Sequence, residues 1–217
     1  MKQESVLEVK NLEFSFHTYG GVVKAVRDVS FDLREGEILG IVGESGCGKS
    51  VTAQCILKLN PEPPGFFGEH SSICFRGEEL VSKTEKEMQA VRGAEIGFIF
   101  QDPMTSLNPT MKIGRQIEEV LKGRKGYSKK EVREKVLKIL EMVGISDAKK
   151  RYKQYPYELS GGMKQRVMIA IALVGNPGIV IADEPTTSLD VTIEASILDL
   201  LKELQKTLHT AISFYYA

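Results

Sequence analysis

One short stretch constrains this chain more than any other, because it combines glycines with a lysine and a serine. The segment from Gly43 to Ser50 follows a compact apolar run, residues 38–42, and precedes a segment with the pattern of a helix, residues 51–59. Glycines allow a tight turn whose N–H groups face inward, and a helix N-terminus adds partial positive charge. This order of strand, glycine-rich turn and helix predicts a phosphate-binding loop.

Residues of this loop have candidate roles toward a nucleotide. The Lys49 ammonium can reach the β- and γ-phosphates, and the Ser50 hydroxyl can bind Mg²⁺. A glycine-rich turn with a chance lysine is the alternative, and the flanking strand and helix argue against it. The residues that we expect to surround the phosphates are Gly43, Glu44, Ser45, Gly46, Cys47, Gly48, Lys49, Ser50 and, through its backbone N–H, Val51.

Length and composition exclude several classes of protein. The 217 residues suit one α/β domain with room for an inserted subdomain. Basic and acidic side chains balance at 29 each, so no global positive field points to nucleic acid. The three cysteines lack the spacing of metal ligands or of a disulfide framework, which fits a reducing cytosol. Apolar runs fall far short of the roughly 20 residues that cross a bilayer, so a membrane role would need a partner.

Alternating apolar residues predict β-strands early in the chain, at residues 6–9 and 29–33, with a turn at residues 17–21. An aromatic side chain near this turn could stack on an adenine ring. Phe16 is the first choice and Tyr19 the second. An ordinary aromatic residue of a β-sheet explains Phe16 equally well, so both interpretations stay open.

Polar side chains stand at the ends of two buried apolar runs, where parallel strands present groups to a ligand. Gln101 follows residues 96–100 and can reach into a crevice that holds a nucleotide, although loop glutamines are common. Asp183 and Glu184 follow residues 179–182. Asp183 fits a role in holding Mg²⁺ through water, and Glu184 fits the base that polarises an attacking water. A solvated strand end is the alternative for these carboxylates.

Residues 104–158 lose the strand pattern and predict a helical insertion between strands. Ser128 and Glu131 have the spacing of a capping box, and Gly144 stands where a helix-ending glycine belongs. Lysine and arginine greatly outnumber acidic residues in the stretch 122–153. A solvated helical surface and a contact zone near a membrane both explain this excess.

A second glycine-containing helix start follows at Ser160, Gly161 and Gly162. Ser160 can cap the helix, and the glycines let a ligand approach its N-terminus. A second anion site and a plain N-cap with flexible glycines explain this pattern equally well. Farther along, residues 193–208 carry apolar side chains on one helical face, and residues 211–217 predict a last strand.

The order of these motifs resembles that of an ATP-binding cassette (ABC) transporter ATPase, over nearly the whole chain. Residues 43–50 resemble the Walker A motif, Gln101 the Q-loop, 159–166 the family signature, 179–184 the Walker B motif and 188–190 the D-loop. Residues 100–109, 155–158 and 182–192 are more closely similar to the ATPases of dipeptide, oligopeptide and nickel importers.

The resemblance implies an α/β fold: a P-loop NTPase (RecA-like) core with an antiparallel β-subdomain and an inserted α-helical subdomain. Within a single nucleotide-binding domain, 1–217, residues 1–100 would form the β-subdomain and the Walker A part of the core. Residues 101–160 would form the Q-loop and helical subdomain, and residues 161–217 the signature helix, Walker B and D-loop. ATP and Mg²⁺ are the implied cofactors.

The resemblance also assigns roles to residues. The implied catalytic residues are Glu184, Gln101 and Lys49, and the implied metal ligands are Ser50, Gln101 and Asp183. Nucleotide contacts are further implied for Ser160, Gly161, Gly162 and Asp190.

An energy-coupling ATPase that drives import of peptides or related solutes is therefore expected, peripheral to the cytoplasmic side of the cell membrane. The implied partners are a second ABC ATPase subunit, identical or different, and transmembrane permease subunits that touch the region after Gln101. Nucleic acid is not an expected partner. Two subunits would lie head to tail, each ATP between the Walker A motif of one and the signature of the other.

Some features depart from the family pattern. Val51 stands where many relatives carry threonine. The family's switch histidine, in a Thr-His-Asp context after the last core strand, has no counterpart, since His209 precedes that strand. The C-terminal extension of the peptide importers is also absent, so we expect a truncated chain or a fragment. An ATP-binding module with little or no hydrolysis and a soluble non-transport ABC ATPase are therefore alternatives.

Overall fold

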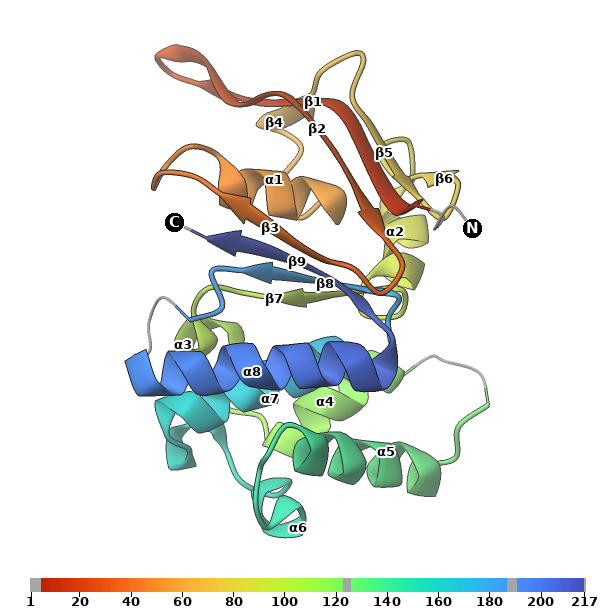
Figure 1. Cartoon of the computed structure of the whole chain (residues 1–217), viewed down its shortest axis with the longest axis vertical. Helices are drawn as coiled ribbons and strands as arrows, with labels where there is room; N and C mark the ends of the chain where they lie inside the picture. The colour runs from red at the N-terminus through yellow and green to blue at the C-terminus, as the bar shows by residue number, and fades with distance from the viewer. Residues whose placement is uncertain (1–4, 123–125, 187–190, 217) are drawn as a thin grey trace.

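The structure is a computed structural model that describes residues 5–122, 126–186 and 191–216. Its elements form stacked layers: an antiparallel sheet, a helix beneath it, a parallel sheet, and a layer of helices on the far side (Figure 1). This arrangement confirms the expected α/β class.

The antiparallel sheet has five strands in the order β2-β1-β5-β6, with β4 also paired to β1. The turn between the first two strands is shorter than residues 17–21, because β1 extends to Thr18 and β2 already begins at Gly21. The strands are β1 (Ser5–Thr18), β2 (Gly21–Arg34), β4 (Gly65–Phe67), β5 (Ser72–Phe75) and β6 (Glu78–Glu79).

The parallel sheet has four strands in the order β3-β9-β8-β7. All five residues of β8 are buried, which explains why its sequence is a continuous apolar run rather than an alternating one. The strands are β3 (Ile38–Val42), β7 (Ile96–Ile99), β8 (Ile179–Asp183) and β9 (Ala211–Tyr216).

Two helices lie on the side of the antiparallel sheet. Helix α1 (Lys49–Ile56) is shorter than the expected segment 51–59, because Lys58 adopts a left-handed φ of 47° and the helix stops before it. Helix α2 (Glu85–Val91) was not expected from the apolar pattern. Thr84 and Glu87 form a capping box at its start.

The remaining helices form the lower layer, and those within residues 103–158 agree with the helical insertion expected at residues 104–158. The Ser128–Glu131 capping box is present, and Gly144 follows the end of α5 with a φ of 77°. The helices are α3 (Pro103–Ser106), α4 (Ile113–Leu121), α5 (Lys129–Met142), α6 (Ala148–Arg151), the 3₁₀ helix η1 (Pro156–Glu158), α7 (Gly161–Leu173) and α8 (Val191–Leu208).

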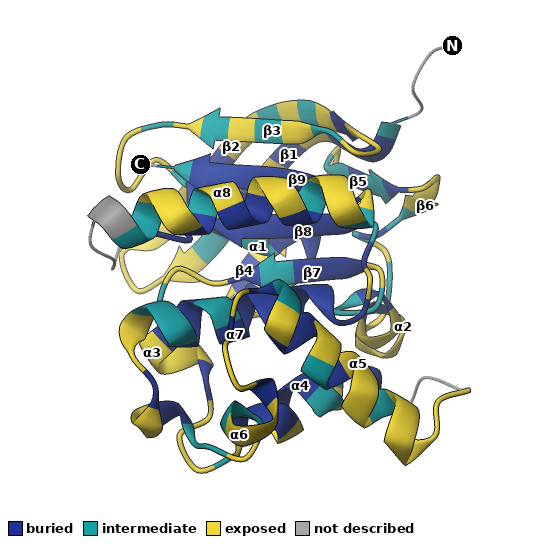
Figure 2. Cartoon of the chain, turned by 60° about the horizontal axis from the view of Figure 1, so that its bottom comes forward, coloured by how far each residue is buried: buried dark blue, intermediate teal, exposed yellow. Residues whose placement is uncertain are grey.

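Strand β8 separates two hydrophobic cores. Ile179 and Ile181 belong to the core beneath the antiparallel sheet, whereas Val180 and Ala182 belong to the core shared with the helices. Figure 2 shows β8 and β9 buried behind the exposed face of α8. At Gly97 of β7 a Cβ atom would overlap the carbonyl of Ala172, so α7 lies with its backbone directly on this strand.

Candidate nucleotide-binding site

The carboxyl ends of the parallel strands meet at one edge of the sheet, on the left in Figure 1. The phosphate loop follows β3 at this edge, Gln101 follows β7 by two residues, and Asp183 is the last residue of β8. Residues that are far apart in the sequence therefore face a common region, as parallel topology requires.

The phosphate loop is held against the antiparallel sheet by close backbone packing. Gly48 has a φ of 99°, and a Cβ atom there would overlap the Ala25 carbonyl oxygen of β2. Gly46 also has a positive φ, 80°. These positions suit glycine, and they turn the chain sharply into α1, whose N-terminus has no side-chain cap.

The Lys49 side chain folds back beneath the loop. Its ammonium donates hydrogen bonds to the carbonyl oxygens of Gly43, at 2.7 Å, and Glu44, at 2.8 Å, and the residue is 7% exposed. The loop carbonyls compensate the buried charge. Lys49 is thus held at the loop, close to the N-terminus of α1, where an anion would be stabilised.

The Ser50 hydroxyl donates a hydrogen bond to a carboxylate oxygen of Asp183, at 2.9 Å. Burial raises the pKa of Asp183, and the hydrogen bond from Ser50 opposes this rise. A hydroxyl and a carboxylate oxygen so close together are donors that Mg²⁺ prefers, with phosphate oxygens completing the shell. In the described ranges, no cluster of three or more His, Cys, Asp or Glu side chains is arranged to hold a metal ion.

The side chain of Glu184 accepts a hydrogen bond from the Gln101 amide, at 2.8 Å. Glu184 is 8% exposed and has a left-handed φ of 44°, and its N–H donates to the Tyr215 carbonyl of β9 at 2.9 Å. The backbone therefore fixes this carboxylate at the end of β8, beside the Ser50–Asp183 pair. A carboxylate in this position can take a proton from a water that attacks a phosphate.

Ser160, Gly161 and Gly162 lie in a different layer from the phosphate loop. The Ser160 hydroxyl caps α7 by accepting a hydrogen bond from the Met163 N–H at 3.4 Å. Helix α7 packs against β7 and the helices α3, α4 and α5, whereas α1 packs against β1, β8 and β9. Within one chain, the two glycine-containing helix starts are on opposite faces of the parallel sheet.

Phe16 and Tyr19 differ in their surroundings. Phe16 in β1 is partly buried against the core, with its ring edge-to-face with Phe14 at 5.2 Å. Tyr19 is fully exposed at the β1–β2 turn. Adenine stacking on Phe16 stays a prediction, and Asp190 lies outside the described residues.

The structure also shows contacts that the sequence patterns did not indicate. Gln165 of α7 is fully buried, and its amide donates to the Pro185 carbonyl oxygen at 2.5 Å. The Thr186 hydroxyl donates to the Glu194 carboxylate at 2.8 Å. Both contacts hold the segment that follows Glu184, so α7 and α8 support the end of β8. The sequence gives little signal for Gln165, because it stands between two other polar residues, Lys164 and Arg166, before the apolar part of α7 begins.

The fold and this edge of the sheet define a nucleotide-binding domain of the P-loop NTPase class. Residues 26–187 match the profile of the family described as "ABC transporter". The chain belongs to this family. None of the helices in the described part of the chain combines the length and apolar character needed to cross a bilayer.

Curated relatives agree with the family assignment. The chain is 59% identical over 209 residues to the oligopeptide transport ATP-binding protein OppD of Bacillus subtilis (strain 168), covering 96% of this chain and 58% of the relative. It is 52% identical over 215 residues to the dipeptide transport ATP-binding protein DppD of Lactococcus lactis subsp. cremoris (strain MG1363), covering 99% of this chain and 61% of the relative. The chain thus spans about three fifths of the length of these relatives.

Solved structures share the fold. A dimeric ATP-binding cassette in a post-hydrolysis state, bound to ADP and Pi, superposes with a TM-score of 0.83 at 28% identity. The match covers 97% of this chain and 87% of that structure. A dimeric bacterial ABC transporter cassette superposes with a TM-score of 0.82 at 29% identity. This match covers 96% of this chain and 87% of that structure.

Proposed function

We propose that this chain binds ATP with Mg²⁺ and couples its hydrolysis to the import of peptides. The observation that carries the proposal is the pairing of Ser50 with Asp183 and of Gln101 with Glu184, at the sheet edge where the phosphate loop begins. Lys49 would bind the β- and γ-phosphates, and Ser50, Asp183 and Gln101 would hold Mg²⁺. Bound Mg²⁺ would neutralise phosphate charge, and Glu184 would orient and deprotonate the attacking water.

The chain would work as part of a pair. Ser160, Gly161 and Gly162 are on the opposite face of the sheet from the phosphate loop of the same chain, so an anion bound by both must lie between two chains. A head-to-tail arrangement would place these residues and Asp190 of one subunit near the phosphates of the other. The dimeric cassettes with the same fold support this arrangement.

The proposal extends to the membrane partner and the solute. The relatives are described as oligopeptide and dipeptide transport ATP-binding proteins, which supports peptides as the transported class. The region after Gln101 would contact transmembrane permease subunits, and the chain would bind peripherally at the cytoplasmic face of the membrane. Exposed Phe100 and Met104 provide apolar surface in that region.

Titration calorimetry with ATP and Mg²⁺ tests the first step. Lys49→Ala should weaken ATP binding by at least about 30-fold, because a buried charged contact is lost. Lys86→Ala, which changes an exposed lysine of α2, is the matched control and should bind like the parent chain. Equal affinity of the Lys49 variant and the control would exclude the phosphate-loop assignment.

Uptake of a labelled oligopeptide by cells that produce either the parent chain or its Glu184→Gln variant tests the coupling to transport.

A further inference from the structure

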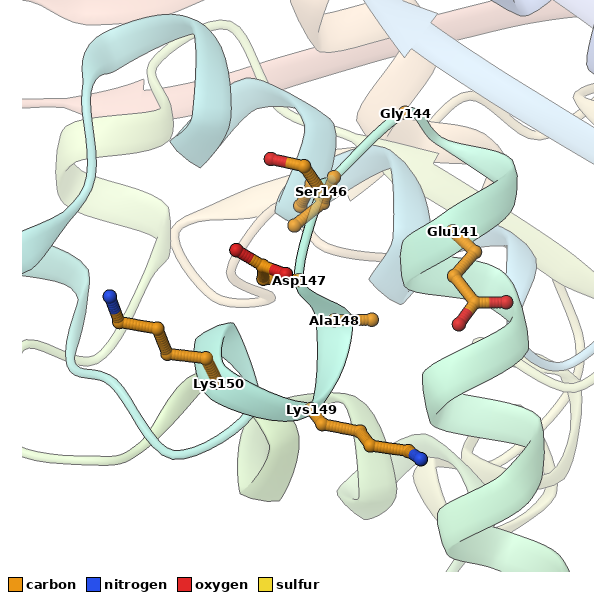
Figure 3. Close-up of a pocket in the computed structure, with 8 residues that line it drawn as sticks. Glu141, Gly144, Ser146, Asp147, Ala148, Lys149 and Lys150 are labelled. Carbon is orange, nitrogen blue, oxygen red and sulfur yellow. The ribbon is translucent and has the colours of Figure 1, made fainter.

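Two hollows open on the surface of the helical layer, away from the nucleotide-binding edge. The first, of about 750 Å³, lies at the turn between α5 and α6. Figure 3 shows that its Lys149 and Lys150 side chains extend in different directions, and that the Glu141 carboxylate points away from Asp147. These charged groups do not point toward a common position, so the first hollow offers no site where they could bind one ligand together.

The second hollow, which we name the α4–α5 pocket, has a volume of about 500 Å³. Its lining includes side chains of α4 and α5 together with Tyr127 and Tyr152. Four cationic side chains line it: Arg115, Lys122, Lys129 and Arg133. The pocket therefore concentrates positive charge beside aromatic rings in a chain whose overall charge is balanced.

The floor of the α4–α5 pocket is built by close packing around Tyr152. A Cβ atom at Gly114 would overlap the Tyr152 ring, so glycine at this position of α4 lets the ring lie against the helix. The Arg133 guanidinium lies over the same ring, 5.4 Å from its centroid. A cation–π contact of this kind is not a hydrogen bond, so it leaves guanidinium N–H groups available to donate to an anion.

The single carboxylate in the lining is already satisfied. Glu118 accepts a hydrogen bond from the Tyr152 hydroxyl and pairs with Arg115 at 3.3 Å. Burial and the neighbouring Glu118 raise the pKa of Tyr152, so its phenol stays protonated at neutral pH. Lys122 pairs with Glu119 at 3.1 Å, outside the lining.

The other two cations keep their charge available. Within residues 5–122, 126–186 and 191–216, neither Lys129 nor Arg133 has a carboxylate within ion-pair distance. Both residues are exposed to solvent. Two uncompensated cations that share one concave surface favour an anion that can accept several hydrogen bonds, and a phosphate group meets that requirement.

We propose that the α4–α5 pocket binds a phosphate-bearing anion, supplied either by a soluble phosphate compound or by the headgroup of an anionic lipid. The site is separate from the phosphate loop, because it lies within the helical layer on the far side of the parallel sheet. Arg133 and Lys129 make the principal contacts, and Arg115 and Lys122 add to the local field.

The test compares two double variants that lose the same charge. Lys129→Gln with Arg133→Gln changes the pocket, whereas Lys138→Gln with Lys153→Gln changes exposed lysines of the same layer that do not line it. Each pair is made in the Lys49→Ala background, so that the phosphate loop contributes little to binding. Pyrophosphate binding is measured by calorimetry, and sedimentation with phosphatidylglycerol or phosphatidylcholine vesicles is measured in parallel.

We expect the pocket variant to bind pyrophosphate at least about tenfold more weakly than the background, as for loss of a charge-assisted hydrogen bond, and the control variant to be unchanged. Binding of both pyrophosphate and phosphatidylglycerol vesicles, each lost in the pocket variant alone, identifies a lipid source. Pyrophosphate binding without vesicle binding identifies a soluble source. No binding to either probe, or equal loss in both double variants, overturns the proposal. Unfolding temperatures confirm folding, and Lys129→Gln alone repeats the comparison without altering the contact between Arg133 and the Tyr152 ring.

Discussion

Ser50 and Asp183 are 133 positions apart in the sequence, yet the hydroxyl of the first lies 2.9 Å from a carboxylate oxygen of the second. Helix α1 supplies Ser50 and strand β8 supplies Asp183, so the contact joins the phosphate loop to the centre of the parallel sheet. Glu184 follows directly and is oriented by β9 and Gln101.

Glu184→Gln should slow ATP hydrolysis by about 10²- to 10⁴-fold, because the amide retains the shape but cannot accept a proton. ATP binding should persist, and the variant should accumulate as an ATP-bound dimer. Phosphate release and light scattering with ATP and Mg²⁺ measure the two effects. Glu203→Gln, on the exposed face of α8, is the control and should hydrolyse ATP at the parent rate. A variant that hydrolyses ATP normally would remove Glu184 from the role of base.

Gly48→Ala should lower the unfolding temperature and the affinity for ATP more than Gly36→Ala does. Gly48 and Gly36 both have positive φ values, 99° and 67°, so alanine costs roughly 1–2 kcal/mol of backbone strain at either position. Only at Gly48 would the added methyl group overlap a backbone atom, the Ala25 carbonyl oxygen. Gly36→Ala is therefore the matched control in thermal unfolding and ATP titration. Equal losses in both variants would show that the approach of β2 to the loop is unimportant.

Gln165→Ala should lower the free energy of unfolding by about 1–3 kcal/mol, because the buried Pro185 carbonyl loses its hydrogen-bond donor. Urea unfolding measures the change. Gln89→Ala, at an exposed position of α2, removes the same side chain without burying an unsatisfied group. If both variants unfold at the same urea concentration, the contact between α7 and the end of β8 contributes nothing to stability.

Glu79 should make stability depend on pH. Partial burial would raise its pKa, but hydrogen bonds from the Ser72 hydroxyl and the N–H groups of Ile73 and Val81 outweigh this effect and lower it. Because the pKa of Glu79 is lower in the folded state than in the unfolded state, its ionised carboxylate stabilises the fold. This stabilisation is fully present above the ordinary carboxyl pKa of 4.5 and is lost as the pH falls through the pKa of the folded state.

Glu79→Gln should therefore unfold at a lower urea concentration than the parent at pH 7, and the gap should shrink at pH 3. Glu69→Gln, at an exposed position, is the comparison. A gap that stays constant between the two pH values would argue against a role of the ionised carboxylate.

Local patterns predicted the glycine-rich loop, a buried strand over residues 179–184 and the capping box at Ser128, because each depends on a few adjacent residues. The strand itself ends one residue earlier, at Asp183. Contacts across the sheet could not be derived in this way. The order β3-β9-β8-β7 brings Gln101 to Glu184, 83 positions away, and it depends on the packing of the whole chain. The division of the chain into subdomains at residues 100 and 160 stays a prediction.

Two elements show why the remaining expectations were incomplete. Helix α2 is short, and its start is marked by Thr84 and Glu87 rather than by a long apolar period. Helix α1 ends early because Lys58 takes a left-handed conformation, where its ammonium donates to the carbonyls of Val81 and Lys83. Contacts with residues far along the chain thus accompany the end of this helix, and the local apolar period does not indicate them.

The absence of a side chain at Gly97 has a mechanical consequence. Because a Cβ atom at Gly97 would overlap the Ala172 carbonyl, α7 and β7 are in direct backbone contact at this position, with no side chain between them. The strand leads to Gln101, and the helix begins at Gly161. Since the two backbones touch there, the end of α7 cannot shift toward the sheet unless the start of β7 shifts with it, so helix and strand are coupled at this point.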